Sequence, residues 1–87
     1  MSICIAAMYI FVVIDDPNLI KIQIELICNE FNTLGALIVA HEGLNGTISF
    51  SRNDMENVIT KIRSIPKFEP IDVKYSFSDN NPFVRMV

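Results

Sequence analysis

The residues best suited to binding or catalysis lie together in the middle of the chain. The stretch His41-Glu42-Gly43-Leu44-Asn45-Gly46-Thr47 holds two of the three glycines and the single histidine of the 87-residue sequence. Apolar runs flank it, which predicts a tight connection between two strands, with Gly43, Asn45 and Gly46 at positive φ and Thr47 starting the next strand. Backbone N–H groups at such a turn, with the Glu42 and Asn45 side chains, could bind a ligand or a neighbouring domain. Turn chemistry alone also explains the glycines, so both interpretations stay open.

Other kinds of chemistry find little support in the sequence. His41 and Glu42 are adjacent, so on a strand they would point to opposite faces, and no metal site is expected. Cys4 and Cys28 have neither disulfide nor metal spacing and lie among apolar residues, so we expect two buried free thiols. The phosphate-binding glycine motifs of nucleotide-binding folds do not occur, and the glycine pair joins two strands, whereas the glycine loop of KH domains joins two helices. We therefore predict no catalytic set, no metal and no cofactor.

Composition indicates one small folded domain with an uneven charge distribution. Apolar residues make up 51% of the chain, which is enough for a core. Residues 1–43 hold one base against five acids, a net charge of −4, and residues 44–87 hold six bases against five acids, a net charge of +1. A domain that bound nucleic acid by itself should be basic. The apolar run from Ile3 to Ile14 is too short for a membrane helix and lacks the features of a signal peptide, so we expect a core segment. The two expected free thiols are typical of a reducing cytoplasm.

The first half of the chain predicts a strand followed by a helix. The segment from Ile3 to Val13 is rich in β-branched and aromatic residues and apolar on both faces, which is typical of a central strand covered on both sides. Asp16 as N-cap and Pro17 at the first helical position begin a helix that runs to Thr33, with Gly35 as its stop. Part of this segment also alternates like a strand, but its length favours the helix.

The second half predicts two strands, a helix and a last strand. The segments Ala36 to Ala40 and Gly46 to Phe50 form a pair, and Ile71 to Phe77 alternates like an edge strand. Between them, Ser51 and Asp54 form a capping box that starts a helix ending at Pro66. The order β-α-β-β-α-β predicts an α+β, ferredoxin-like fold, with two helices on one face of a four-stranded antiparallel sheet. Acylphosphatases share this fold, but here the acidic loop after the first strand would repel phosphate, so that activity is not expected.

The central motif resembles a known family signature. Residues 42–48 are similar to the E-G-[IL]-N-G-T-[IL] signature in the N-terminal domain of the rhodanese-related tRNA uridine hydroxylases, the TrhO (YceA-like) family. Tyr9 and Phe11 resemble the "LYKF" start of that domain. Ser51-Arg52 is similar to its serine-led second helix, and Pro82-Phe83-x-Arg85-Met86 to the segment that leads into the rhodanese domain.

The resemblance implies an accessory role. In that family an acylphosphatase-like N-terminal domain precedes a rhodanese domain, which carries the active-site cysteine and hydroxylates the wobble uridine of tRNA. The parent protein is therefore expected to be an oxidoreductase. Neither Cys4 nor Cys28 matches that cysteine, so the fragment alone is expected to be inactive. Residues 1–80 are then the domain, and residues 81–87 begin a linker toward a rhodanese domain that this sequence does not contain.

Two surfaces follow as candidates for contact. The sheet face without helices, with the Glu42–Thr47 turn and the tail residues Phe83 and Arg85, is the expected contact with the rhodanese domain. The basic residues near the second helix are candidates for tRNA phosphate contacts, although such residues are commonly just solvated: Arg52, Lys61, Arg63 and Lys67. The alternative is a free-standing interaction module that forms a homodimer through the same uncovered face.

Overall fold

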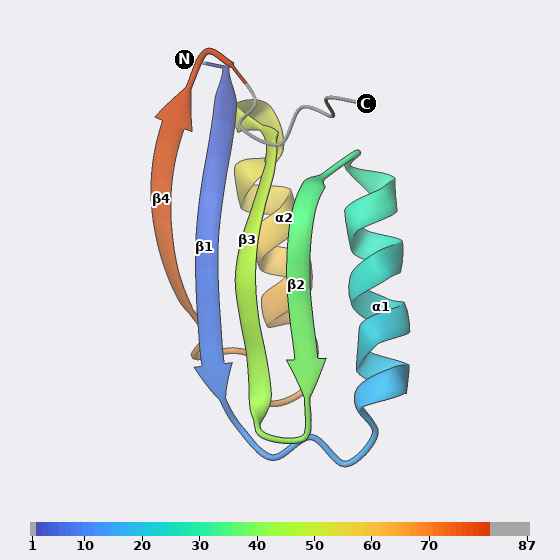
Figure 1. Cartoon of the computed structure of the whole chain (residues 1–87). Coiled ribbons are helices and arrows are strands. Elements are labelled where there is room, and N and C mark those ends of the chain that lie inside the picture. The colour runs from blue at the N-terminus through green and yellow to red at the C-terminus, as the bar shows by residue number, and fades with distance from the viewer. Residues whose placement is uncertain (1, 81–87) are drawn as a thin grey trace.

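The structure, a computed structural model, describes residues 2–80 of the chain (Figure 1). A short 3-10 turn, Arg52–Asp54, precedes the second helix. The elements in chain order are β1 (Ile3–Phe11), α1 (Pro17–Glu30), β2 (Leu34–Ala40), β3 (Gly43–Ser51), α2 (Met55–Arg63) and β4 (Asp72–Ser78).

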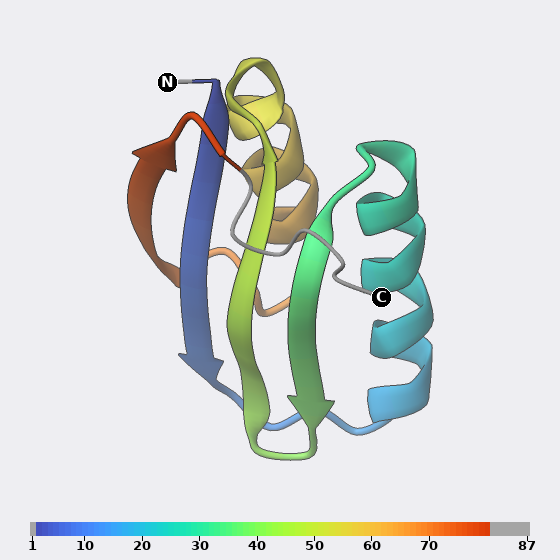
Figure 2. The ribbon, with the colours of Figure 1, turned by 45° about the horizontal axis from the view of Figure 1, so that its top comes forward.

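The four strands form one antiparallel sheet in the order β2-β3-β1-β4. Figures 1 and 2 show both helices on the same side of this sheet, so within residues 2–80 no helix covers the other face. Each helix connects two strands that are separated by one strand, which is the split βαβ arrangement. The predicted α+β, ferredoxin-like fold is therefore confirmed.

The core lies between the sheet and the helices. Alternate residues of β1 point into it, and they are almost completely buried. On α2, Val58, Ile59 and Ile62 close the core from the other side, and each buried side chain of this size stabilises the fold by about 1.5–3 kcal/mol. The largest buried side chains are Phe50 on β3 and Phe68 in the connection from α2 to β4.

The start of α1 agrees with the sequence prediction, and its end does not. The Asp16 side chain accepts a hydrogen bond from the Leu19 N–H at 3.2 Å, and Pro17 is the first helical residue. The helix ends at Glu30 because Asn32 adopts a left-handed conformation, with φ 52°. The Thr33 N–H then donates to the Cys28 carbonyl at 2.9 Å, as in a Schellman motif. Gly35, which we expected to stop the helix, lies inside β2.

The predicted capping box of the second helix is wrong. Ser51 is the last residue of β3, and neither Ser51 nor Asp54 makes a side-chain capping hydrogen bond. The 3-10 turn occupies the positions where the box would be, so α2 starts only at Met55. Its first turn is held instead by the apolar face that packs against the sheet.

Candidate functional site

The turn between β2 and β3 is shorter than the sequence suggested. Ala40 pairs with Gly43, so only His41 and Glu42 connect the strands, and residues 43–47 belong to β3. Among the described residues with a side chain, only Asn32 and Lys67 have positive φ. The prediction of positive φ is therefore confirmed for the two glycines and wrong for Asn45, because the motif is mostly strand.

The two glycines are required by close contact between backbones. Gly43 has φ +144°, and a Cβ atom there would lie 2.0 Å from the carbonyl oxygen of Ile10 on β1. Gly46 has φ +146°, and its Cβ would lie 2.2 Å from the carbonyl oxygen of Ala36 on β2. Such backbone conformations are essentially restricted to glycine. The glycines of the motif therefore let β3 fit between its two neighbours.

The short turn is fixed to the chain that follows β1. The Val12 N–H donates to the Glu42 carbonyl at 3.0 Å, and the Ile14 N–H donates to the His41 carbonyl at 2.8 Å. The His41 Nδ1 lies 3.0 Å from the Ile14 carbonyl, which can only accept, so this nitrogen carries the proton. His41 thus holds the turn in place, a role that the sequence did not indicate.

The open face of the sheet carries exposed apolar side chains beside the motif. The strand register places Tyr9, Asn45 and Ile38 in one row across β1, β3 and β2. Phe11 is 82% exposed, Ile38 64% and Tyr9 40%. The rings of Tyr9 and Phe11 lie 6.3 Å apart at 56°, a tilted arrangement that aromatic pairs favour. Side chains of this kind on an uncovered sheet are typical of a contact surface.

A small hollow interrupts this surface above Gly43. Its volume is about 60 Å³, and its wall includes Phe11, Ile38, Glu42 and Asn45. The hollow exists because the glycine contributes no side chain between its neighbours on β1 and β2. Glu42 at the turn and Asp72, which pairs with Tyr9, place two acids near the aromatic side chains. The open face can therefore receive an apolar side chain flanked by a basic one.

The four predicted phosphate contacts each have an intramolecular partner. The Lys61 ammonium forms an ion pair with Glu30 at 2.8 Å. Arg63 donates from Nη2 to the Ile71 carbonyl at 3.3 Å, and Lys67 donates from Nζ to the Val13 carbonyl at 3.2 Å. The Arg52 guanidinium lies 4.6 Å from the centre of the Phe77 ring.

These four residues do not form one basic patch. Arg52 follows β3, whose last residue pairs with Ile3 at the start of β1. Lys67 contacts Val13, beyond the other end of β1. At about 3.3 Å per residue, the ten residues between these points place the two bases roughly 30 Å apart.

The cysteines occupy different environments. Both are free thiols; Cys4 is fully buried in the core as expected, whereas Cys28 on α1 is only half-buried. Burial raises the pKa of the Cys4 thiol, and the nearby Arg52 guanidinium lowers it by a smaller amount. A neutral, buried thiol is a poor nucleophile. The part of the chain that the structure describes holds no cluster of three potential metal ligands.

Some expectations fall outside the described region. The tail residues Phe83 and Arg85, and the linker expected at residues 81–87, lie beyond residue 80. Within residues 2–80, neither helix is long and apolar enough to cross a membrane.

The fold and its comparisons define the class of the protein. A four-stranded antiparallel sheet with two helices on one face is the architecture of acylphosphatase-like domains. Residues 3–87 match the family described as "UPF0176 acylphosphatase like domain", and the chain belongs to this family.

Two curated relatives are longer proteins from Caulobacter vibrioides. In the strain NA1000 / CB15N, a tRNA uridine(34) hydroxylase is 33% identical over 82 residues, which cover 94% of this chain and 26% of that protein. The tRNA uridine(34) hydroxylase of the strain ATCC 19089 / CIP 103742 / CB 15 gives the same values. The chain thus spans about a quarter of the length of these relatives.

Proposed function

We propose that this chain is the N-terminal accessory domain of a tRNA uridine hydroxylase and has no catalytic activity by itself. The similarity to two tRNA uridine(34) hydroxylases over nearly the whole chain supports this proposal. The two cysteines also support it, since one is a buried core thiol and the other lies on a helix packed against the sheet. A cytoplasmic location follows from a tRNA substrate and from free thiols.

The open sheet face is the surface that docks on the rhodanese domain of the parent chain. The observation that carries this proposal is the exposure of Phe11, Ile38 and Tyr9 on a face that neither helix covers. Exposed aromatic and aliphatic side chains beside a hollow are the usual anchors of a protein interface. Glu42, Asn45 and Thr47 lie on or beside this surface and provide its polar contacts, while Gly43 and Gly46 shape it.

The domain contributes to tRNA binding mainly by shaping the parent protein. Phosphate binding requires bases that are close together and available. Arg52, Lys61, Arg63 and Lys67 are engaged within the domain, and the first and last of them are separated by the length of the sheet. We therefore assign at most peripheral phosphate contacts to these residues.

The first test of the accessory role is the reading frame beyond Val87. A downstream rhodanese domain with a cysteine in its active-site loop supports the proposal. A stop codon directly after Val87 contradicts it for this chain.

The docking proposal is tested in the parent protein with Phe11→Ser and Ile38→Ser. Both variants should lower the melting temperature of the parent and the fraction of hydroxylated uridine 34 in cellular tRNA, measured by mass spectrometry. The matched control is Ile22→Ser, which replaces an apolar side chain of α1 that is 53% exposed. Equal losses in the control and the sheet variants would contradict docking through the open face.

The alternative function, a free-standing homodimeric module, rests on the same exposed side chains. It predicts a compact dimer of the 87-residue chain in sedimentation experiments. Phe11→Ser should convert that dimer to a monomer, whereas a monomeric wild type excludes this alternative.

A further inference from the structure

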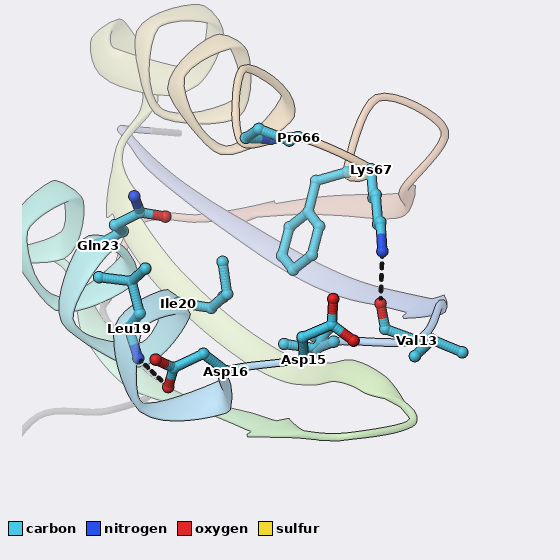
Figure 3. Close-up of a pocket in the computed structure, with 10 residues that line it drawn as sticks. Val13, Asp15, Asp16, Leu19, Ile20, Gln23, Pro66 and Lys67 are labelled. Atoms are coloured by element: carbon cyan, nitrogen blue, oxygen red, sulfur yellow. Dashed lines mark hydrogen bonds between the residues drawn. The ribbon is translucent and has the colours of Figure 1, made fainter.

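Two hollows of similar size flank α1, and one of them lies at an edge of the sheet. On the α2 side, a hollow of about 290 Å³ lies between the start of the helix and Pro66 (Figure 3). Its rim carries Asp15 and Asp16 as well as Lys67, so its charge favours no particular partner. On the other side, a hollow of about 300 Å³ lies between α1 and β2. Because β2 is an outermost strand, this second hollow lies at the edge of the sheet.

The outer edge of β2 presents backbone hydrogen-bonding groups to its surroundings. Within residues 2–80, β3 is its only neighbour in the sheet. The Ala36 carbonyl oxygen points to β3, because it would lie 2.2 Å from a Cβ atom on Gly46. Inward and outward groups alternate along an antiparallel edge strand, so Gly35, Leu37 and Val39 direct their N–H and C=O groups away from β3. Groups of this kind can pair with a further strand.

The sequence of β2 complements itself when two copies run antiparallel. With a two-fold axis at Leu37, each larger side chain on either side of the axis faces a smaller one of the second copy. The facing residues are Leu34 and Ala40, Val39 and Gly35, and Ile38 and Ala36. The same axis brings the outward backbone groups of one copy opposite those of the other, so hydrogen bonds can form along the whole strand. A shift by one residue would destroy both matches.

Charge complementarity also points to a copy of the same chain. None of the seven side chains of β2 is charged, so two copies of the strand approach without repulsion. On α1, Lys21 and Glu25 are one helical turn apart and line the hollow beside β2. The two-fold axis makes the two α1 helices antiparallel, so the positive end of this pair in one copy faces the negative end in the other.

The hollow beside β2 can receive side chains of the added strand. Leu37 and Val39 lie on the helix side of β2, where they are half-buried against the core. The same two residues of the second copy therefore point into the hollow between α1 and β2. On the open side, Ile38, which is 64% exposed, packs against Ala36 of the second copy. Pairing thus buries apolar surface on both faces of the strand.

We propose that two copies of the chain associate through β2 in this antiparallel register. Their two four-stranded sheets become one continuous sheet, with β2 of each copy at its centre. The open faces stay accessible on the same side of that sheet. This association is therefore compatible with docking through the open face, and the two proposals can fail separately.

Sedimentation and amide hydrogen exchange of the 87-residue chain test the proposal. The chain should form a dimer, and the outward N–H groups of Leu37 and Val39 should exchange more slowly as the dimer forms. Phe11→Ser removes an exposed ring of the open face and should leave both results unchanged. The proposal would be overturned by a chain that stays monomeric at millimolar concentration, by a dimer without this protection, or by a dimer that Phe11→Ser dissociates.

Opposite charges at one exposed position of β2 identify the interface. Ala36→Lys places two like charges close together across the two-fold axis and should raise the dissociation constant at least about tenfold. Ala36→Glu should do the same by itself, whereas a mixture of the two variants should dimerise again, because opposite charges then meet.

The matched control lies on the other edge strand. Ser76 is exposed on β4, on the same face of the sheet as Ala36, so Ser76→Lys adds the same charge far from the proposed interface. It should leave the dissociation constant unchanged. Dimers of Ala36→Lys as stable as those of the wild type, a mixture that stays monomeric, or an equal loss for Ser76→Lys would each contradict association through β2.

Discussion

The two faces of β1 are both apolar and have very different surroundings. Toward the helices, Cys4, Ala6 and Met8 are almost completely buried. On the other face of the same strand, Phe11 is 82% exposed and Tyr9 is 40% exposed. Hydropathy alone cannot distinguish these faces, because both are apolar.

The difference shows which part of the apolar surface the chain covers by itself. The two helices bury one face and supply the core that stabilises the fold. The apolar side chains of the other face contribute little to folding within the described residues, although they have the character of an interface. Substitutions on the two faces should therefore separate stability from association.

The largest effect is expected for Phe50→Ala on the covered face. Phe50 is one of the largest fully buried side chains, and its removal leaves a cavity among rigid neighbours. We expect a loss of about 3–5 kcal/mol in the free energy of unfolding. Urea denaturation of the 87-residue chain measures this loss, and a change below about 1 kcal/mol would show that the covered face is not the core.

A somewhat smaller loss is expected for Gly43→Ala in the motif. The new Cβ would collide with the Ile10 carbonyl oxygen, and the backbone has a conformation that alanine avoids. Strain and overpacking together should cost roughly 2–4 kcal/mol, measured by thermal unfolding. Asn45→Ala, on the same strand but without positive φ, is the control and should be nearly neutral. Equal stability of both variants would contradict the structural role of the glycine.

The buried Cys4 thiol should make the fold less stable at alkaline pH. Its folded-state pKa is raised by burial, so on alkalinisation the unfolded chain loses this proton first. Stability should fall as the pH rises above the ordinary thiol pKa of about 9.0, which holds in the unfolded chain, until the folded-state pKa is passed. Urea unfolding at about pH 7 and pH 10 should show that the free energy of unfolding declines less with pH for Cys4→Ala than for the wild type. Cys28→Ala keeps Cys4, so its free energy of unfolding should decline as in the wild type. Identical declines in all three proteins would refute this assignment.

The smallest effect is expected for Phe11→Ala on the open face. The side chain is 82% exposed, so its removal should change the unfolding free energy of the isolated chain by no more than about 0.5 kcal/mol. Urea denaturation alongside Phe50→Ala gives the direct contrast between the faces. A loss comparable with that of Phe50→Ala would mean that this face is covered within the chain itself.

Most of the fold was predictable because its signals are local. The order of elements, the Asp16 cap and the doubly apolar first strand follow from capping chemistry and residue patterns. The errors concern the ends of elements, both of the helices and of strands such as β3, which starts at Gly43 instead of Gly46. Asn32 rather than Gly35 takes the left-handed position at the end of α1. Both residue types tolerate this conformation, so the sequence did not decide between them. The Ser51 cap failed because the chain is still paired in β3 at that point.

The site was predictable in its location but not in its geometry. The glycines indicated positive φ, but their position in β3 depends on how closely the backbones of β1 and β2 approach that strand. The basic residues look alike in the sequence, whereas their partners are set by contacts with distant segments, as for Lys61 with Glu30. The role of His41 likewise depends on Ile14, 27 residues earlier.

The neutral composition of β2 has a consequence for handling the isolated chain. This outermost strand has seven residues, none of them charged and none proline, and it has a neighbour only on the β3 side within residues 2–80. β4, at the other edge, carries Asp72 and Lys74. Uncharged edges readily pair with strands of other molecules, whereas charged edges resist this. When the chain is concentrated, aggregation by strand addition should therefore begin at β2, and a lysine on that strand should suppress it.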